Sequence, residues 1–370
     1  MLCPIAIENI QSDMLLHTAL KLALKSPHSP DVDWQPVFHT AKDRDWQILL
    51  SDLELHRLQP LMFYAFKLHG CVRDMPKFVL QKLMAAYFFS LQRNTILFQS
   101  LTTALEPIYE MSIYPVLWKG VVLADQLYPN VATRMIGDID WAIAPYELTS
   151  TCNVLERLGF TCQASMTTSD AVYYKSPDQI LLDIHHRVRL FEGKEHLQIT
   201  QTIQPHSKIL PELHILEANA MLVHLTVHLL GHRSEKGLLL FWILDFVFLL
   251  RKWGHHLDWD ILNALIPDSA TWQFLGELLH FLQVELEEPL PSMFHPLVRA
   301  HRPLTLAAIT RQCRLAPWGL PRPKGWFKLA ACRVGLQTHK HRYPQFSDLL
   351  LWMTDLKWET GRLQSALSEH

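Results

Sequence analysis

The sequence has little net charge and few of the signals that mark specialised protein classes. Its 34 basic and 36 acidic residues leave a formal charge of -2 over 370 residues, so the overall charge does not indicate a nucleic acid or an anionic membrane as a partner. It contains no fixed-period repeat and no low-complexity tract. With 49% hydrophobic and 19% charged residues, it is typical of a globular protein with two domains, or one large domain with extensions.

The sequence also lacks the features of secreted and membrane-spanning proteins. Its six cysteines include no Cys-x-x-Cys pair, and no basic-then-apolar leader precedes them, so we expect a location in the reducing cytoplasm. The most apolar run, Leu238 to Leu250, has only 13 residues and contains Asp245. Because a membrane-spanning helix needs about 20 apolar residues, this run predicts a buried helix and no transmembrane segment.

The hydrophobic pattern divides the chain into three parts. From residue 14 to 110 the apolar residues recur at spacings of three and four, which is typical of amphipathic helices. Residues 113–189 instead alternate short β-branched and aromatic runs with helical stretches, and the helical pattern returns after Pro205 and Pro211. We therefore predict an α+β fold in which a small mixed-sheet α/β core (111–205) is flanked by an N-terminal helical region (1–110) and a C-terminal helical region (206–370).

Two carboxylates stand two residues apart in a β-prone run that begins at Gly137. Because side chains alternate along a strand, Asp138 and Asp140 are expected on the same face. Like charges this close repel each other, and burial would raise the pKa of at least one of them unless a divalent cation lies between them. Oxygen ligands favour a hard cation, so we predict a Mg²⁺ site, with Mn²⁺ as the alternative ion.

A third carboxylate, Asp183, follows in a predicted hairpin whose second strand reads Leu-Leu-Asp-Ile-His. It shares a face with His185, which we expect to orient this carboxylate or to approach the acceptor. If this strand lies beside the first, the three carboxylates can hold metal ions that bind phosphates and lower the pKa of an attacking hydroxyl. The alternative is an Asp-x-Asp pair on a solvated strand end with no catalytic role.

The segment upstream of the carboxylates has the features of a phosphate site. Residues 116–124 read as a strand, a Lys-Gly turn and the start of a helix. Gly120 would let backbone amides approach a phosphate at the positive end of the helix dipole. Lys119 adds a charge there, and Arg134 is placed to reach a triphosphate.

These elements occur in the order LWKGVVLADQLYPNVATRMIGDIDWAI, then LLDIHHRV. The set resembles the signature of an uncharacterised nucleotidyltransferase family within the DNA polymerase β superfamily, and the similarity extends over about 80 residues. It implies Mg²⁺-dependent transfer of a nucleoside monophosphate from an NTP, with ATP among the candidates, to an acceptor group, with release of pyrophosphate. The acceptor stays open between a small molecule, a protein and an RNA.

The resemblance also implies roles for individual residues. It assigns catalysis and metal binding to Asp138, Asp140 and Asp183, and nucleotide binding to Lys119, Gly120, Arg134 and His185. The chain departs from the wider superfamily at Val121, where serine or glycine is usual after the first glycine. One hydroxyl contact to phosphate is therefore missing, and we expect Lys119 and Arg134 to replace it.

A second candidate site consists of histidines. His224, His228 and His232 are spaced by four and form a stripe on one helix face, with Asp245 on the next predicted helix. A metal-dependent hydrolase built on this stripe is one alternative function, but the chain has neither an HExxH helix nor a His-Asp dipeptide. We favour hydrogen-bonded histidines that line the core. A non-catalytic nucleotide-binding or interaction module is the other alternative.

Positive charge gathers near the C-terminus. Residues 301–347 include six arginines and three lysines but no aspartate or glutamate. Aromatic residues interleave with these charges, a mixture that suits an anionic acceptor such as a nucleic acid. A solvated face that pairs with the acidic remainder, or a patch on a membrane surface, would show the same composition.

Overall fold

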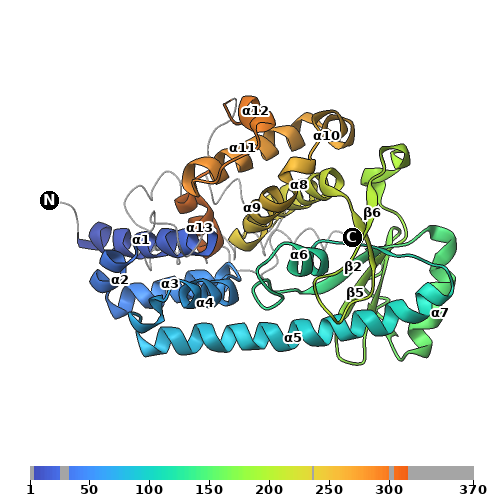
Figure 1. Cartoon of the computed structure of the whole chain (residues 1–370), viewed down its shortest axis with the longest axis horizontal. Helices are drawn as coiled ribbons and strands as arrows, with labels where there is room; N and C mark the ends of the chain where they lie inside the picture. The colour runs from blue at the N-terminus through green and yellow to red at the C-terminus, as the bar shows by residue number, and fades with distance from the viewer. Residues whose placement is uncertain (1–3, 26–32, 236, 300–303, 316–370) are drawn as a thin grey trace, which may run out of the picture.

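The computed structural model describes residues 4–25, 33–235, 237–299 and 304–315. An N-terminal group of helices is followed by a mixed β-sheet and then by a second group of helices (Figure 1). This arrangement confirms the predicted α+β fold with a mixed sheet between helical regions.

The N-terminal helices have the apolar spacing that the sequence shows. Helices α1, α3 and α4 pack against one another, and α5 contacts α4 at one end and α7 at the other. Figure 1 shows α5 running along the molecule from the N-terminal helices to the sheet. The helices are α1 (Pro4–Leu24), α2 (Gln35–Thr40), α3 (Asp43–Leu55), α4 (Gln59–Leu68) and α5 (Lys77–Glu110).

The sheet has seven strands in the order β3-β4-β5-β2-β1-β7-β6. The β1–β7 and β2–β5 pairs are parallel and the other pairs are antiparallel. The strands are β1 (Val116–Trp118), β2 (Asp138–Ala142), β3 (Thr161–Cys162), β4 (Ala171–Lys175), β5 (Leu181–His185), β6 (Thr200–Ile203) and β7 (Leu213–Leu216), with α6 (Gly120–Gln126) and α7 (Leu148–Arg157) between them.

The predicted boundary at residue 205 is wrong, because the sheet continues beyond it. Strand β7 pairs in parallel with β1 at the centre of the sheet, with Val116 opposite His214. Prolines at 205 and 211 lie in the connection from β6 to β7. In the sequence, a connection with two prolines resembles a linker at the end of a domain. The helical region therefore begins at α8 (Ala218–Glu235).

Helices α8 and α9 (Leu240–Trp253) contact each other, and α8 also contacts α10 (Trp259–Leu265) and α11 (Ser269–Glu285). The chain continues through α12 (His295–Arg299) and α13 (Leu306–Leu315). The apolar run at 238–250 forms most of α9, and nearly all of its side chains are buried, as predicted. Within the described residues, no helix has the length and apolar character that crossing a membrane requires.

Candidate active site

The three predicted carboxylates meet on neighbouring strands. Asp140 on β2 lies directly opposite Asp183 on β5 in the parallel register, and the alternation along β2 places Asp138 on the same face. Asp140 and Asp183 are buried, with 3% and 9% of their surface exposed. Ile139 and Leu182, which pair with each other and immediately precede Asp140 and Asp183, are fully buried in the core, and this apolar layer fixes which face carries the carboxylates.

His185 completes a group of potential metal ligands. One ligand atom from each of Asp140, Asp183 and His185 lies within 4.8 Å of the others. The His185 Nε2 and Asp183 Oδ1 atoms are 3.2 Å apart, yet both are buried and neither has a hydrogen-bond partner among the described residues. Buried polar atoms are seldom left without partners. Two oxygen ligands and an imidazole nitrogen suit a divalent cation, so these residues fit a metal ion.

Lys119 provides a positive charge beside these carboxylates. Its ammonium group donates to the Asp140 Oδ1 atom at 2.7 Å, and the Lys119 side chain is only 16% exposed. The residue precedes α6 with a φ of 51°, a left-handed value that costs a residue with a side chain about 1–3 kcal/mol. Such conformations persist only where the surrounding structure holds them in place, and they are common at functional sites.

Asp138 is held in an environment that disfavours its charged form. Burial and the Asp140 carboxylate raise its pKa to about 6, and Lys119 opposes this rise. Asp138 is therefore partly protonated near neutral pH in the absence of a bound cation. A divalent cation would favour the ionised carboxylate, which is the electrostatic behaviour expected of a metal ligand.

The family model described as "Uncharacterised nucleotidyltransferase" matches residues 42–284. The chain belongs to this family. Among solved structures it is similar to an antigenic nucleotidyltransferase-like protein from Paracoccidioides brasiliensis, with 13% sequence identity, coverage of 57% of this chain and 95% of that chain, and a TM-score of 0.33. No curated protein matches it.

The family match confirms the resemblance read from the Lys-Gly turn and the Asp-x-Asp strand. In this member of the family, two side chains pack closely against Gly120. A Cβ atom added at Gly120 would lie 3.0 Å from the Ile136 Cγ2 atom and 3.1 Å from the Arg134 Nη1 atom. The close approach of these two side chains is a packing reason for glycine here, independent of any phosphate.

The sequence predicts that Arg134 contacts a triphosphate. In the structure, Arg134 instead forms a buried ion pair with Asp245 on α9. Its Nε and Nη2 atoms donate to the two Asp245 carboxylate oxygens at 2.8 and 2.7 Å, and the Tyr128 hydroxyl donates to the same carboxylate at 2.8 Å. The side chains of Arg134 and Asp245 are 6% and 1% exposed. The guanidinium that we expected to bind phosphate is therefore already neutralised by the Asp245 carboxylate.

The histidine stripe on α8 begins beside the carboxylate site at His224, whose ring stacks with that of His228, and the His228 and His232 rings meet edge to face. The His224 ring centroid is 5.4 Å from that of Trp118, which is in turn 5.2 Å from that of His185. Burial lowers the pKa of His224 well below its usual range, so its ring is neutral. Among the described residues, only Asp140, Asp183 and His185 bring three potential metal-ligand atoms within 4.8 Å of one another, and Asp245 is engaged by Arg134.

Two arginines near the carboxylates were missed by the sequence analysis. Arg93 on α5 donates from Nη2 to the Gly137 carbonyl oxygen at 3.1 Å, immediately before Asp138. Arg57 lies between α3 and α4; burial lowers its pKa, and the nearby Asp138 charge opposes this shift. No local sequence pattern connects Arg57 to a strand about 80 residues later.

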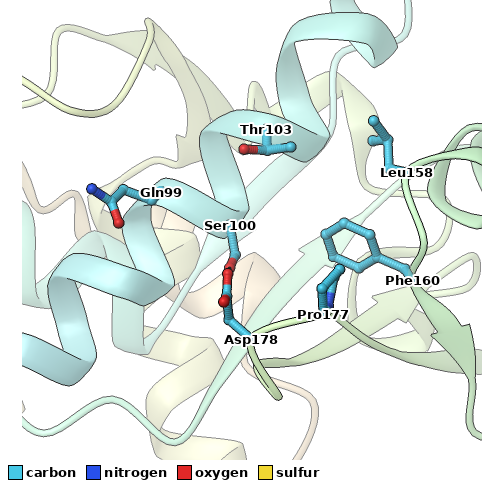
Figure 2. A pocket seen from close by; sticks show the side chains of 7 residues that line it. All are labelled: Gln99, Ser100, Thr103, Leu158, Phe160, Pro177 and Asp178. Carbon is cyan, nitrogen blue, oxygen red and sulfur yellow. The ribbon is translucent and has the colours of Figure 1, made fainter.

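One surface pocket lies apart from the carboxylates. It has a volume of about 110 Å³ and lies between α5, the end of α7 and the β4–β5 turn; its lining residues are Gln99, Ser100, Thr103, Leu158, Phe160, Pro177 and Asp178 (Figure 2). It holds none of the predicted site residues. Most of the basic segment at 301–347 lies outside the described residues.

Proposed function

We propose that this chain transfers a nucleoside monophosphate from an NTP to an acceptor in a reaction that depends on Mg²⁺, with Mn²⁺ as a substitute. In this reaction an acceptor oxygen bonds to the α-phosphorus, the bond from that phosphorus to the β-phosphate oxygen breaks, and pyrophosphate leaves. The observation that carries the proposal is the meeting of Asp138, Asp140 and Asp183 on adjacent strands, with the buried Asp183 Oδ1 and His185 Nε2 atoms lacking hydrogen-bond partners among the described residues.

Asp138, Asp140 and Asp183 would hold the metal ions, with His185 beside Asp183. A bound divalent cation supplies positive charge that neutralises phosphate oxygens and lowers the pKa of an attacking hydroxyl. We assign Asp183 to the acceptor side, where its Oδ1 atom can accept the proton of the attacking group. His185 lies 3.2 Å from that oxygen and would orient it.

Lys119 and the Gly120 amide would bind the charge that develops as pyrophosphate leaves. Lys119 is paired with Asp140, so we expect it to exchange this partner for phosphate once metal binds the carboxylate. We propose a supporting role for Arg134. Its charge is neutralised by Asp245, and its Nη1 atom packs against Gly120, where it would stabilise the Lys-Gly turn.

The Lys119–Asp140 ion pair favours a second candidate. An ammonium group 2.7 Å from the carboxylate neutralises it much as a cation would, and a chain that kept this pair permanently would bind nucleotide without catalysis. This candidate is the non-catalytic nucleotide-binding module.

One experiment tests both candidates. The full chain is incubated with each α-labelled NTP, cell extract and either Mg²⁺, Mn²⁺ or EDTA, and the release of pyrophosphate and the transfer of label are measured. Transfer that needs the cation and disappears in Asp140→Asn and Asp183→Asn supports the enzyme. NTP binding by isothermal titration with no pyrophosphate release under any condition supports the module, and transfer that persists in both variants contradicts the assigned residues.

A further inference from the structure

We propose that Arg57 and Arg93, from the N-terminal helices, bind the phosphate groups of the donor nucleotide. The inference rests on the proposed function and names the part of the chain that recognises the triphosphate. It makes the N-terminal helical region a component of the active site, in addition to its packing role.

The first support is the position of Arg93. Its guanidinium donates from Nη2 to the Gly137 carbonyl oxygen at 3.1 Å, and the neighbouring Asn94 amide donates to the Arg134 carbonyl oxygen at 2.8 Å. These bonds fix α5 against the segment that leads into β2. Among the described residues no carboxylate pairs with Arg93, so its guanidinium, held at the residue before Asp138, has no anionic partner in that part of the chain.

The second support is the position of Arg57. The junction between α3 and α4 is held by His56, whose Nδ1 atom accepts from the Leu240 amide at 3.2 Å. Arg57 itself has a φ of 56°, a left-handed value that local interactions must maintain. Its guanidinium lies 5.6 Å from the centre of the Phe241 ring, and the Arg134 guanidinium lies at the same distance from that ring. Burial lowers the pKa of Arg57, and the nearby Asp138 charge opposes this shift.

The charge balance of the site explains why further cations are needed. Three carboxylates face one ammonium group, and Lys119 is paired with Asp140 while Arg134 is paired with Asp245. An NTP adds a strongly negative triphosphate to this face. Arginine is well suited to the task, because its planar guanidinium binds phosphate oxygens through two parallel hydrogen bonds.

The arrangement along β2 gives the site two ends. Arg93 and Gly120 lie near Gly137 and Asp138 at the start of the strand, whereas His185 pairs with Ala142 at its end. From Asp138 to Ala142 the strand extends about 13 Å at the usual rise of 3.3 Å per residue. The triphosphate would therefore extend toward α5, and the acceptor would approach from the side of His185 and Trp118.

The test measures binding of inorganic tripolyphosphate, which has no base or sugar, to the full chain by isothermal titration in the presence of Mg²⁺. Arg57→Gln and Arg93→Gln are compared with Arg73→Gln, a matched control whose exposed side chain lies in the same helical region. Loss of a charge-assisted contact is expected to weaken affinity about tenfold in each site variant. The control should bind as the unmodified chain does.

Further measurements separate phosphate binding from a purely structural role. Arg57→Lys and Arg93→Lys keep the charge and should recover part of the affinity, and the affinity of the Gln variants should depend less on salt than that of the unmodified chain. A fluorescent single-stranded oligonucleotide forms a second arm, because an anionic acceptor also carries phosphate. If the variants weaken oligonucleotide binding and leave tripolyphosphate affinity unchanged, the inference is overturned in favour of an acceptor site.

Unchanged tripolyphosphate affinity in both Gln variants, with normal thermal unfolding midpoints, would also overturn the inference. The proposed function would then stand if the unmodified chain still transferred label. An unmodified chain that neither binds tripolyphosphate nor transfers label would remove the proposed function together with the inference.

Discussion

At the scale of single residues, the candidate site combines charges whose environments differ sharply. Asp140 is buried and has Lys119 as an ion-pair partner at 2.7 Å. Asp138, two residues earlier, is close to both but has a raised pKa because burial and Asp140 outweigh Lys119. Two carboxylates that look equivalent in the sequence should therefore respond differently to the same substitution.

We predict that Asp138→Asn makes the folded chain more stable at pH 7.5 without divalent cations. The folded-state pKa is raised from 3.8 to about 6, so the unmodified chain loses stability as the pH rises from about 4 to 6, by up to about 3 kcal/mol. The variant escapes this loss, and its advantage should shrink at pH 5, where Asp138 is largely protonated. Chemical denaturation at the two pH values measures the difference.

Asp140→Asn is the matched comparison for this prediction. It also removes a negative charge, but it leaves the largely buried Lys119 ammonium group without its ion-pair partner. It should therefore be less stable than Asp138→Asn at pH 7.5. Equal stability of the two variants, or a gain for Asp138→Asn that is as large at pH 5, would contradict the different environments described for the two carboxylates.

The residue types at the carboxylate site could be read from the sequence because their signals are local. Alternation along a strand places Asp138 with Asp140, and Asp183 with His185. Charge alone could not show that Arg134 faces Asp245, because the two stand 111 positions apart and the pairing depends on how α9 packs. The arginines at 57 and 93 were missed for the same reason.

At the scale of whole elements, one buried contact joins the loop before β2 to α9. Arg134 and Tyr128 both donate to Asp245, which is 1% exposed. The apolar run predicted α9 as a buried helix, and the sequence connected the aspartate inside it only with the histidine stripe. The structure supplies the reason for this aspartate, since its carboxylate neutralises a buried guanidinium beneath the Lys-Gly turn.

We predict that Asp245→Asn lowers the free energy of unfolding by about 3–5 kcal/mol, because it leaves Arg134 charged and buried without a counter-ion. Tyr128→Phe removes only one hydrogen bond to the pair and should cost about 1 kcal/mol. Glu192→Gln, which breaks the exposed pair with Arg187, is the control and should change stability by less than about 1 kcal/mol. Urea denaturation of the three variants tests the ranking, and a cost for Asp245→Asn no larger than for Glu192→Gln would contradict it.

At the scale of the whole molecule, the sequence predicted the helix–sheet–helix order but placed one boundary too early. Local periodicity identifies strands and helices, but it does not show which strands share a sheet. Strand β7 pairs with β1 across almost 100 residues of sequence, so its membership of the sheet is a tertiary fact. The same limit applies to the contribution of α5, which reads as a packing helix and carries Arg93 to the edge of the site.

The charge distribution along the chain supports a prediction at this scale, which concerns the acceptor. Every residue that we assign to metal and nucleotide binding lies between 57 and 185, whereas the basic segment spans 301–347 and has no acidic residue. Reversing four of its charges, in Arg311→Glu, Arg314→Glu, Arg322→Glu and Lys324→Glu together, should leave the affinity for Mg²⁺ and NTP unchanged. It should sharply reduce binding of an anionic acceptor, because electrostatic association depends on the local charge.

Fluorescence polarisation with a labelled single-stranded RNA, and label transfer to acceptors in cell extract, measure this effect. In the unmodified chain, binding should weaken steeply with added salt, with a slope in log affinity against log salt of about 0.7 for each neutralised phosphate of a single strand. The reversed variant should lose most of that slope. If it bound RNA and labelled the acceptor as the unmodified chain does, the segment would have no role in acceptor binding, and a small neutral acceptor would become the better candidate, since such a molecule would need only the His185 and Trp118 side of the site.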